Sequence, residues 1–298
     1  MQETGKKIVI YGAGWLGKEI LKWLPNNYDF LAQIVAFVDS YDNNKKIYGI
    51  PVYLPEKLLE IEYDYILIGS CSEKSVREIK EKLYEMGINN DQIITGLEGI
   101  GWHIVQAARY EWIKQFSKWI EDNNIPGNVA ECGVFRGDCA KFINDYFYNR
   151  KLYLFDTFEG FERSDLEKEK EIGNVEFLNG QFNTDSGLFD NTSVARVMEK
   201  MTYPSNVIIK KGWFPQSAEG IEDTFCFVNL DTDLYQPILS GLEFFWDKIE
   251  IGGCILVHDY FHPMLPGVKK AVEDFEKMKD VKLQKMPIGD GCSIAILK

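Results

Sequence analysis

Two glycine-rich turns, each between a short apolar strand and a helix, constrain this chain more than any other feature. The first turn, Gly12-Ala-Gly-Trp-Leu-Gly17, follows the apolar run Lys7-Ile-Val-Ile-Tyr11. The second, Glu131-Cys-Gly-Val-Phe-Arg-Gly137, ends a strand that begins at residue 128. Because strands joined through helices pair in parallel with right-handed crossovers, the two turns predict an α/β chain with two parallel sheets.

The alternation of strands and helices occurs in two series, which predict two doubly wound, Rossmann-like domains. The first series places strands at 7–11, 34–38, 50–53, 65–68 and 92–95. A long helix follows at 102–122, and the second series places strands at 128–132, 151–156, 206–210, 224–231, 253–259, 281–286 and 291–297. A turn-rich link joins the last two strands, so we expect them to form an antiparallel hairpin. We predict domains at residues 1–96 and 97–298.

Charge and hydropathy exclude several classes of partner. The chain has 33 Lys and Arg against 46 Asp and Glu, and its net charge of -13 opposes binding to nucleic acid or to an anionic membrane. No apolar run approaches the roughly 18 residues of a membrane-spanning helix. None of the six cysteines forms a Cys-x-x-Cys pair. We therefore expect reduced thiols in a cytoplasmic protein.

The first turn has the spacing of a dinucleotide-binding fingerprint. Gly12, Gly14 and Gly17 open a helix, and Asp39 ends the next strand, where an acidic side chain can bind a ribose. The same glycines are needed for the turn in an empty domain, so nucleotide binding and a purely structural scaffold remain as alternatives. This half resembles the small Rossmann domains of bacterial sugar-modifying enzymes, and its ligand is unknown.

The second turn has a different spacing, Glu-x-Gly-x-x-x-Gly. Glu131 at the strand end, followed by Gly133 and Gly137, suits a ligand that carries an ammonium group and no phosphate, such as S-adenosylmethionine. Asp156 ends the next strand, where a carboxylate can accept both ribose hydroxyls. Together with the terminal hairpin, this pattern favours a class I methyltransferase.

Five ordered motifs strengthen this interpretation. They are Glu131-Cys-Gly-Val-Phe-Arg-Gly137, Leu154-Phe-Asp-Thr-Phe-Glu-Gly-Phe161, Lys211-Gly-Trp-Phe-Pro215, Asn229-Leu-Asp-Thr-Asp-Leu-Tyr235 and Gly252-Gly-Cys-Ile-Leu-Val-His-Asp-Tyr260. With them the chain resembles the macrocin O-methyltransferase family (TylF/MycF-like) over roughly residues 100–298. The resemblance implies methylation of a sugar hydroxyl with S-adenosylmethionine and a divalent metal.

Four titratable side chains follow two neighbouring strands of the second series. Asp231 and Asp233 end one strand, and His258 and Asp259 end the next. Ligands of open α/β sheets bind outside the carboxyl ends of the strands, and carboxylates that converge there repel one another unless a cation joins them. Oxygen ligands with one imidazole suit Mg²⁺, or Mn²⁺ as a softer option. Two alternatives remain. Asp231 or Asp233 could instead cap the following helix, and His258 could instead be a structural hydrogen-bonding residue.

The resemblance implies roles for these residues and for their neighbours. It makes Asp231 and Asp259 metal ligands, places Asp231 also beside the cofactor, and makes Asp233 the general base. The family more often has aspartate where this chain has His258, so the third ligand is open. Thr157 is expected beside the ribose and Trp213 against the adenine. The charged stretch 162–171 is expected to be a solvated helix or, alternatively, a lid over a ligand.

The sequence therefore predicts a metal-dependent O-methyltransferase. Its substrate would be a sugar hydroxyl on a surface polysaccharide, a nucleotide sugar or a glycosylated natural product, and a homo-oligomer is compatible with the pattern. One alternative is a NAD-dependent sugar oxidoreductase or epimerase that uses the first turn. Another is a non-catalytic nucleotide-binding module of a sugar pathway.

Overall fold

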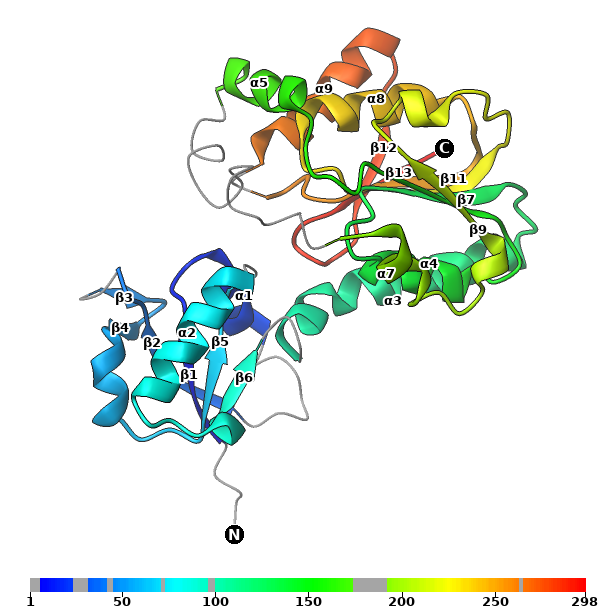
Figure 1. Ribbon diagram of the computed structural model, residues 1–298. Coiled ribbons are helices and arrows are strands. Elements are labelled where there is room, and N and C mark those ends of the chain that lie inside the picture. Colours follow the sequence, from blue (N-terminus) through cyan, green and yellow to red (C-terminus); the bar gives the residue numbers. More distant parts are fainter. Residues whose placement is uncertain are drawn as a thin grey trace. The chain divides into compact units, whose positions relative to one another are not determined.

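Figure 1 shows the computed structural model, which describes residues 6–23, 32–41, 45–70, 73–95, 100–173, 192–262 and 265–298. The chain divides into two compact units, Met1–Ala107 and Ala108–Lys298. Each unit contains its own sheet. Residues 96–99 lie outside the described residues, so the domain boundary at residue 96 stays a prediction.

The first unit is built on a six-stranded sheet in the order β3-β4-β2-β1-β5-β6. All neighbouring strands are parallel except β3, which is antiparallel to β4. Ile8 and Ile10 of β1 pack in the same cluster as α1, while Val9 and Tyr11 pack in the same cluster as α2, because side chains alternate along a strand. The sheet is therefore covered on both faces. The elements are β1 (Lys6–Tyr11), α1 (Trp15–Trp23), β2 (Ala32–Val38), β3 (Lys46–Ile47), β4 (Ile50–Tyr53), η2 (Pro55–Leu59), β5 (Tyr65–Ile68), α2 (Glu73–Glu85), η3 (Asn90–Gln92) and β6 (Ile93–Thr95).

The first glycine-rich turn follows β1, as predicted, and close backbone contacts explain two of its glycines. A Cβ on Gly17 would lie 2.0 Å from the carbonyl oxygen of Gly12, and one on Gly12 would lie 2.7 Å from that of Gly69. A Cβ on Gly14 would have no atom within 4 Å. Asp39 accepts a 2.8 Å hydrogen bond from the amide of Ala13 and so holds the turn. Nucleotide binding and a structural role both remain compatible with this geometry.

The second unit is built on a seven-stranded sheet in the order β12-β13-β11-β10-β7-β8-β9. The strands β7 to β11 are parallel, and β13 is antiparallel to both β11 and β12. The predicted fold class, with two doubly wound sheets and a terminal antiparallel hairpin, is confirmed. The strands are β7 (Asn128–Cys132), β8 (Leu152–Asp156), β9 (Val207–Lys211), β10 (Phe225–Leu230), β11 (Ile249–Val257), β12 (Gln284–Pro287) and β13 (Ile294–Leu297).

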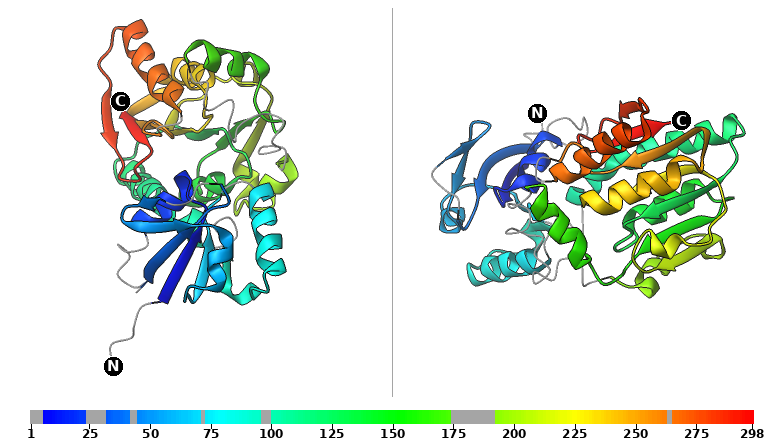
Figure 2. Two further views of the ribbon diagram at one scale, coloured as in Figure 1. Left: turned by 90° about the vertical axis from the view of Figure 1, so that its left-hand side faces the viewer. Right: turned by 90° about the horizontal axis from the view of Figure 1, so that it is seen from above.

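Helices cover both faces of this sheet (Figures 1 and 2). One hydrophobic cluster joins the sheet to α3, α4 and α7, and the other joins it to α5, α8 and α9. Among the described residues, no helix is both long and apolar enough to cross a bilayer. The helices are α3 (Ile100–Asp122), α4 (Asp138–Tyr146), α5 (Arg163–Glu171), α7 (Val194–Met198), α8 (Tyr235–Trp246) and α9 (Pro266–Lys279), with short 3-10 turns η5 (Pro204–Asn206) and η6 (Gln216–Ala218).

The strand order places a topological switch point at the centre of the second sheet, where a ligand crevice is expected. β7 and β10 are neighbours, but the chain runs from β7 toward β8 and from β10 toward β11, on opposite sides. Ligands of open α/β sheets bind at such a switch point, outside the carboxyl ends of the strands. The strand predicted at 253–259 is β11, which begins earlier and ends at Val257. His258 and Asp259 therefore belong to the turn after the strand.

Candidate active site

The turn after β7 contains a buried carboxylate. Glu131 is only 1% exposed, and its Oε1 accepts a 2.8 Å hydrogen bond from the amide nitrogen of Asn229. Its buried Oε2 has no hydrogen-bond partner among the described residues. Burial raises the pKa of Glu131 to about 8, with a further contribution from Asp231. The turn thus places an unsatisfied acidic oxygen beside the crevice.

The glycines of this turn are required by its surroundings. A Cβ on Gly133 would lie 1.8 Å from the carbonyl oxygen of Asp231, so only glycine allows the turn to pass so close to β10. Gly137, at φ +76°, is the N-cap of α4 in the left-handed conformation that glycine adopts most readily. Both predicted glycines therefore shape the crevice.

Asp156, at the end of β8, holds the same turn. Its Oδ2 accepts hydrogen bonds from the amides of Val134 and Phe135, both at 2.8 Å, and its Oδ1 accepts one from Phe158 at 2.7 Å. A carboxylate offers about four acceptor positions, so Oδ1 retains capacity for a ribose hydroxyl. Thr157 donates to the carbonyl of Gly160 at 2.7 Å and closes a local turn.

Trp213 follows β9 and is linked to the charged helix α5. Its indole N–H donates a 3.0 Å hydrogen bond to Asp165 Oδ2, and Asp165 is buried. The amide of Gly212 donates to the carbonyl of Asp156 at 3.0 Å, so the ends of β8 and β9 lie together. The backbone just before Trp213 thus lies beside Asp156, and the stacking of the Trp213 ring on adenine stays a prediction.

Three carboxylates converge at the ends of β10 and β11. Ligand atoms of Asp231, Asp233 and Asp259 lie within 4.8 Å of one another. Asp233 and Asp259 have φ of 61° and 57°, a left-handed conformation that is uncommon for residues other than glycine and frequent at functional sites. Burial and the charges of Asp259 and Asp231 raise the pKa of Asp233 well above its ordinary value. A proton or a cation relieves this repulsion.

The pKa of Asp259 shifts in the opposite direction to that of Asp233, because a hydrogen-bond donor and two imidazoles lie near its carboxylate. Burial alone would raise the pKa of Asp259, but His258, His262 and a hydrogen bond from Cys292 lower it below its ordinary value. The thiol of Cys292 donates to Asp259 Oδ1 at 3.1 Å. Asp259 is therefore held as a carboxylate.

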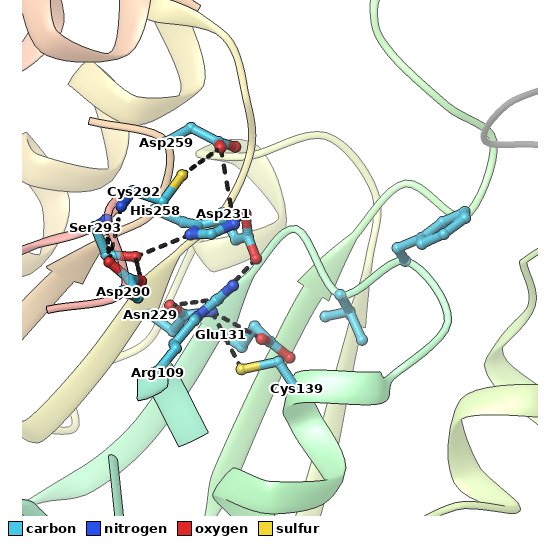
Figure 3. Close-up of polar contacts among 12 residues, drawn as sticks. Arg109, Glu131, Cys139, Asn229, Asp231, His258, Asp259, Asp290, Cys292 and Ser293 are labelled. Atoms are coloured by element: carbon cyan, nitrogen blue, oxygen red, sulfur yellow. Dashed lines mark hydrogen bonds and ion pairs between the residues drawn. The ribbon is translucent and has the colours of Figure 1, made fainter. Parts of the chain in front are cut away.

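Hydrogen bonds orient the imidazole of His258 (Figure 3). The hydroxyl of Ser293 donates to Asp290 Oδ2, and His258 Nδ1 lies 2.9 Å from the same hydroxyl oxygen. Since the only hydroxyl proton is given to Asp290, Nδ1 donates to Ser293. In the neutral imidazole, Nε2 then carries a lone pair. It faces Asp231 Oδ1 at 4.0 Å and Asp259 Oδ1 at 3.8 Å.

The structure brings the predicted cluster residues together in two overlapping groups. The described residues contain a second group of mutually close ligand atoms, formed by His258, Asp259 and Cys292, which shares Asp259 with the three-aspartate group. The predicted trio of Asp231, Asp259 and His258 spans the two groups. Which atoms hold a metal stays a prediction.

Arg109 is a site residue that the sequence interpretation missed. It extends from α3, is 2% exposed, and its Nη2 donates to Asn229 Oδ1 at 2.9 Å and to Asp231 Oδ2 at 2.7 Å. Although burial opposes its charge, the pKa of Arg109 is raised by Asp231, so the guanidinium stays ionised. Figure 3 shows this network linking Arg109, Asn229 and Glu131 beneath Asp231. The only sequence signal is an arginine within an amphipathic helix.

Glu169 of α5 was also missed, and the prediction of a solvated helix is wrong at this residue and at Asp165. Glu169 is 0% exposed, and its carboxylate accepts the amide of Tyr235 at the start of α8. A Cβ on Gly267 would lie 2.6 Å from the same carboxylate, so it also adjoins the start of α9. Helix N-termini favour anions, which explains a buried carboxylate here. The alternative of a lid is not tested.

The seven-stranded sheet with its antiparallel β13 and its acidic turn defines a class I methyltransferase fold. The macrocin-O-methyltransferase (TylF) model matches residues 65–293, and the chain belongs to this family. The chain is therefore an O-methyltransferase, and its dependence on S-adenosylmethionine is implied by the family. The match begins inside the first unit, earlier than the resemblance in the sequence. A second model, C2185-like N-terminal, matches residues 4–94.

Two relatives are similar to this chain. Demethyldecarbamoylnovobiocin O-methyltransferase from Streptomyces niveus is 24% identical over 184 residues, which are 60% of this chain and 69% of the relative. The solved structure of the O-methyltransferase NovP superposes with a TM-score of 0.54 at 22% identity, covering 64% of this chain and 79% of NovP. This structural likeness supports the fold of the second unit.

Proposed function

We propose that this chain transfers the methyl group of S-adenosylmethionine to a hydroxyl of a sugar-containing small molecule or glycan, assisted by a divalent cation. The observation that carries the proposal is the convergence of Asp231, Asp233 and Asp259 beside the acidic turn of β7. The donor site and the acceptor site would then meet at one switch point of the sheet.

The residues of the β7 turn fit the methyl donor. S-adenosylmethionine supplies a methyl group on a sulfonium, and it carries an ammonium group and a ribose. Oε2 of Glu131, which is buried and has no hydrogen-bond partner among the described residues, suits the ammonium group in the ionised form that this cation would stabilise, and Asp156 Oδ1 suits a ribose hydroxyl. Gly133 and Gly137 keep the turn free of side chains where the ligand would approach.

The acidic cluster fits a divalent cation. Three carboxylates suit Mg²⁺, and the lone pair of His258 Nε2 adds a donor that Mn²⁺ accepts more readily. A cation bound here would lower the pKa of a coordinated sugar hydroxyl. We assign Asp231 and Asp259 to the cation, with His258 as the third ligand, because Arg109 and Cys292 already orient the two carboxylates.

Asp233 is the residue best suited to accept the proton of the attacking hydroxyl. Burial and the neighbouring carboxylates raise its pKa, which makes its carboxylate a stronger proton acceptor, although a cation at Asp231 and Asp259 would offset their part of that rise. It lies at the start of the loop into α8, next to the proposed ligand Asp231. A hydroxyl held at the cation would therefore be within reach of its carboxylate.

The acceptor is proposed from the relative and from charge. The name of the Streptomyces niveus enzyme gives demethyldecarbamoylnovobiocin as the molecule that it methylates, which supports a small-molecule acceptor. A nucleotide sugar, a glycosylated natural product and a surface polysaccharide all offer sugar hydroxyls. The net charge of -13 opposes a nucleic-acid acceptor. A cytoplasmic location and a homo-oligomer remain part of this proposal.

The oxidoreductase alternative has less support. The Tyr-x-x-x-Lys spacing of many such enzymes occurs at Tyr41–Lys45, Tyr53–Lys57 and Tyr110–Lys114. Tyr53 packs against the cluster that contains α2, and Lys57 is paired with Glu60. Tyr41 is 95% exposed, and Tyr110 is buried in the second unit, in the cluster that contains α3. The non-catalytic alternative does not explain why buried carboxylates are kept together, since unpaired buried acids are costly.

Calorimetry on the full chain discriminates the proposed methyltransferase from the oxidoreductase. We expect S-adenosylhomocysteine to bind with one site per chain, and Asp156→Ala to weaken that binding because a ribose acceptor and the amide contacts that hold the turn after β7 are both lost. NAD is titrated separately against the same protein. Binding of NAD without binding of S-adenosylhomocysteine would refute the proposal in favour of the oxidoreductase.

A further inference from the structure

A mixed group of donors lies beside the acidic cluster. It consists of His258 and Asp259, in the turn after β11, and Cys292, in the turn before β13. Nε2 of His258 is 3.8 Å from Asp259 Oδ1, and Sγ of Cys292 is 3.1 Å from the same oxygen. All three ligand atoms lie within 4.8 Å of one another. Their donor set is nitrogen, oxygen and sulfur.

Two of the distances between these atoms are close to those around a tetrahedral cation. Zinc lies about 2.0–2.1 Å from imidazole nitrogen, about 2.0–2.2 Å from carboxylate oxygen and about 2.3 Å from sulfur, which separates neighbouring ligand atoms by roughly 3.3–3.6 Å. The distances of 3.1 and 3.8 Å reach that range with small side-chain shifts. Three protein ligands with one open position are also the usual number in catalytic zinc sites.

Ser293 and Asp290 form hydrogen bonds of the kind that usually orient a metal-bound histidine, and they do so at His258. Ser293 and Asp290 are buried, and their hydrogen bonds leave Nε2 facing Asp259, with a lone pair available whenever the ring is neutral. Metal-bound histidines usually donate their other ring N–H to such a partner, which fixes the tautomer and the ring orientation. Asp290 also accepts the amides of Cys292 and Ser293 at 2.9 and 2.8 Å, so the same carboxylate shapes the turn that carries the thiol.

The chemistry of the donors separates this group from the three aspartates. Carboxylate oxygens alone suit Mg²⁺, whereas imidazole and thiolate suit Zn²⁺ and Co²⁺. Asp259 belongs to both groups, and His258 is also the third ligand proposed for the cation of the acidic cluster, so a cation in the mixed group withdraws two ligands from that cation.

We propose that His258, Asp259 and Cys292 form a binding site for a thiophilic divalent cation such as Zn²⁺, which competes with the cation of the acidic cluster. Binding forms one bond each to Nε2, to a carboxylate oxygen and to sulfur, and it releases the thiol proton of Cys292 to solvent. Zn²⁺ then inhibits the Mg²⁺-supported reaction. This last consequence rests on the proposed function, whereas the site itself does not.

Titration of the full chain with Co²⁺ tests the site directly. Co²⁺ reports a thiolate ligand through a sulfur-to-metal charge-transfer absorption in the near ultraviolet. We expect this absorption in the wild-type protein, its loss in Cys292→Ala, and its persistence in the control Cys226→Ala, which removes a buried thiol of β10 instead. Ser293→Ala should keep the absorption but weaken Co²⁺ binding by about 10–100-fold, because it frees the imidazole.

Co²⁺ binding without the charge-transfer absorption, or an absorption that survives Cys292→Ala, would overturn the site. Inhibition is measured separately, by adding Zn²⁺ to the reaction in excess Mg²⁺. We expect Cys292→Ala to resist Zn²⁺ more than wild type, and equal inhibition of both would overturn the competition. If no methyl transfer is detected, the Co²⁺ titration still decides the site. If the titration fails while methyl transfer proceeds, the proposed function stands.

Discussion

Replacing Asp233 by asparagine is expected to reduce methyl transfer by about 10²–10⁴-fold, the usual contribution of a positioned general base. Asparagine has nearly the same shape and tolerates the left-handed backbone, which has a φ of 61° at this position. It cannot accept the hydroxyl proton, however. Binding of S-adenosylhomocysteine and the free energy of unfolding should stay close to wild type, so the loss would appear in kcat.

The same substitution at an exposed aspartate provides the control. Asp247→Asn also replaces an aspartate by its amide, but Asp247 is exposed and pairs only weakly with Lys279 at 3.1 Å. Its rate should remain that of the wild type. An Asp233→Asn protein with wild-type turnover would rule out the assignment of the base.

Replacing Arg109 by methionine is expected to lower the free energy of unfolding by about 3–5 kcal/mol. Methionine fills much of the same volume, but it leaves Asp231 Oδ2 and Asn229 Oδ1 without their donor, inside a buried network. Removing one partner of a buried pair is costly because the other charge stays desolvated. Urea unfolding of the full chain measures the loss as a shift of the midpoint.

Two further variants separate lost charge from lost packing. Arg109→Lys keeps the positive charge but replaces the planar guanidinium by a compact ammonium group, so its loss of unfolding free energy should be intermediate. In the double variant Arg109→Met with Asp231→Asn, the unpaired charge is removed, and part of the stability should return. An unchanged urea midpoint in Arg109→Met would show that the Arg109–Asp231 ion pair does not stabilise the fold.

The fold could be predicted from the sequence because its signals are local. Apolar runs such as those of β1, β7 and β10 end at glycines or acidic residues, and each run is followed by a helical pattern. The two-residue strand β3 carries no such pattern. The start of β11 was missed: the strand expected to begin at residue 253 begins at Ile249 and continues through Gly252, which has a φ of +85°.

The site could be predicted only where its residues follow strands. Asp231, Asp233 and Asp259 come at strand ends, and parallel topology brings those ends together. Arg109, Glu169 and Cys292 come from a helix interior, a charged helix and a hairpin turn, and only tertiary packing shows what they touch. Charged residues are normally exposed, so the burial of Glu169 could not be inferred from its neighbours in the sequence.

The central claim is that the second unit transfers a methyl group with the help of a cation held by its aspartates. Incubating the full chain with methyl-labelled S-adenosylmethionine and a panel of nucleotide sugars tests it most directly. We predict label on a sugar hydroxyl, loss of the label when a chelator is added, and its recovery when excess Mg²⁺ or Mn²⁺ is restored. Methyl transfer that persists unchanged in the chelator would contradict the account.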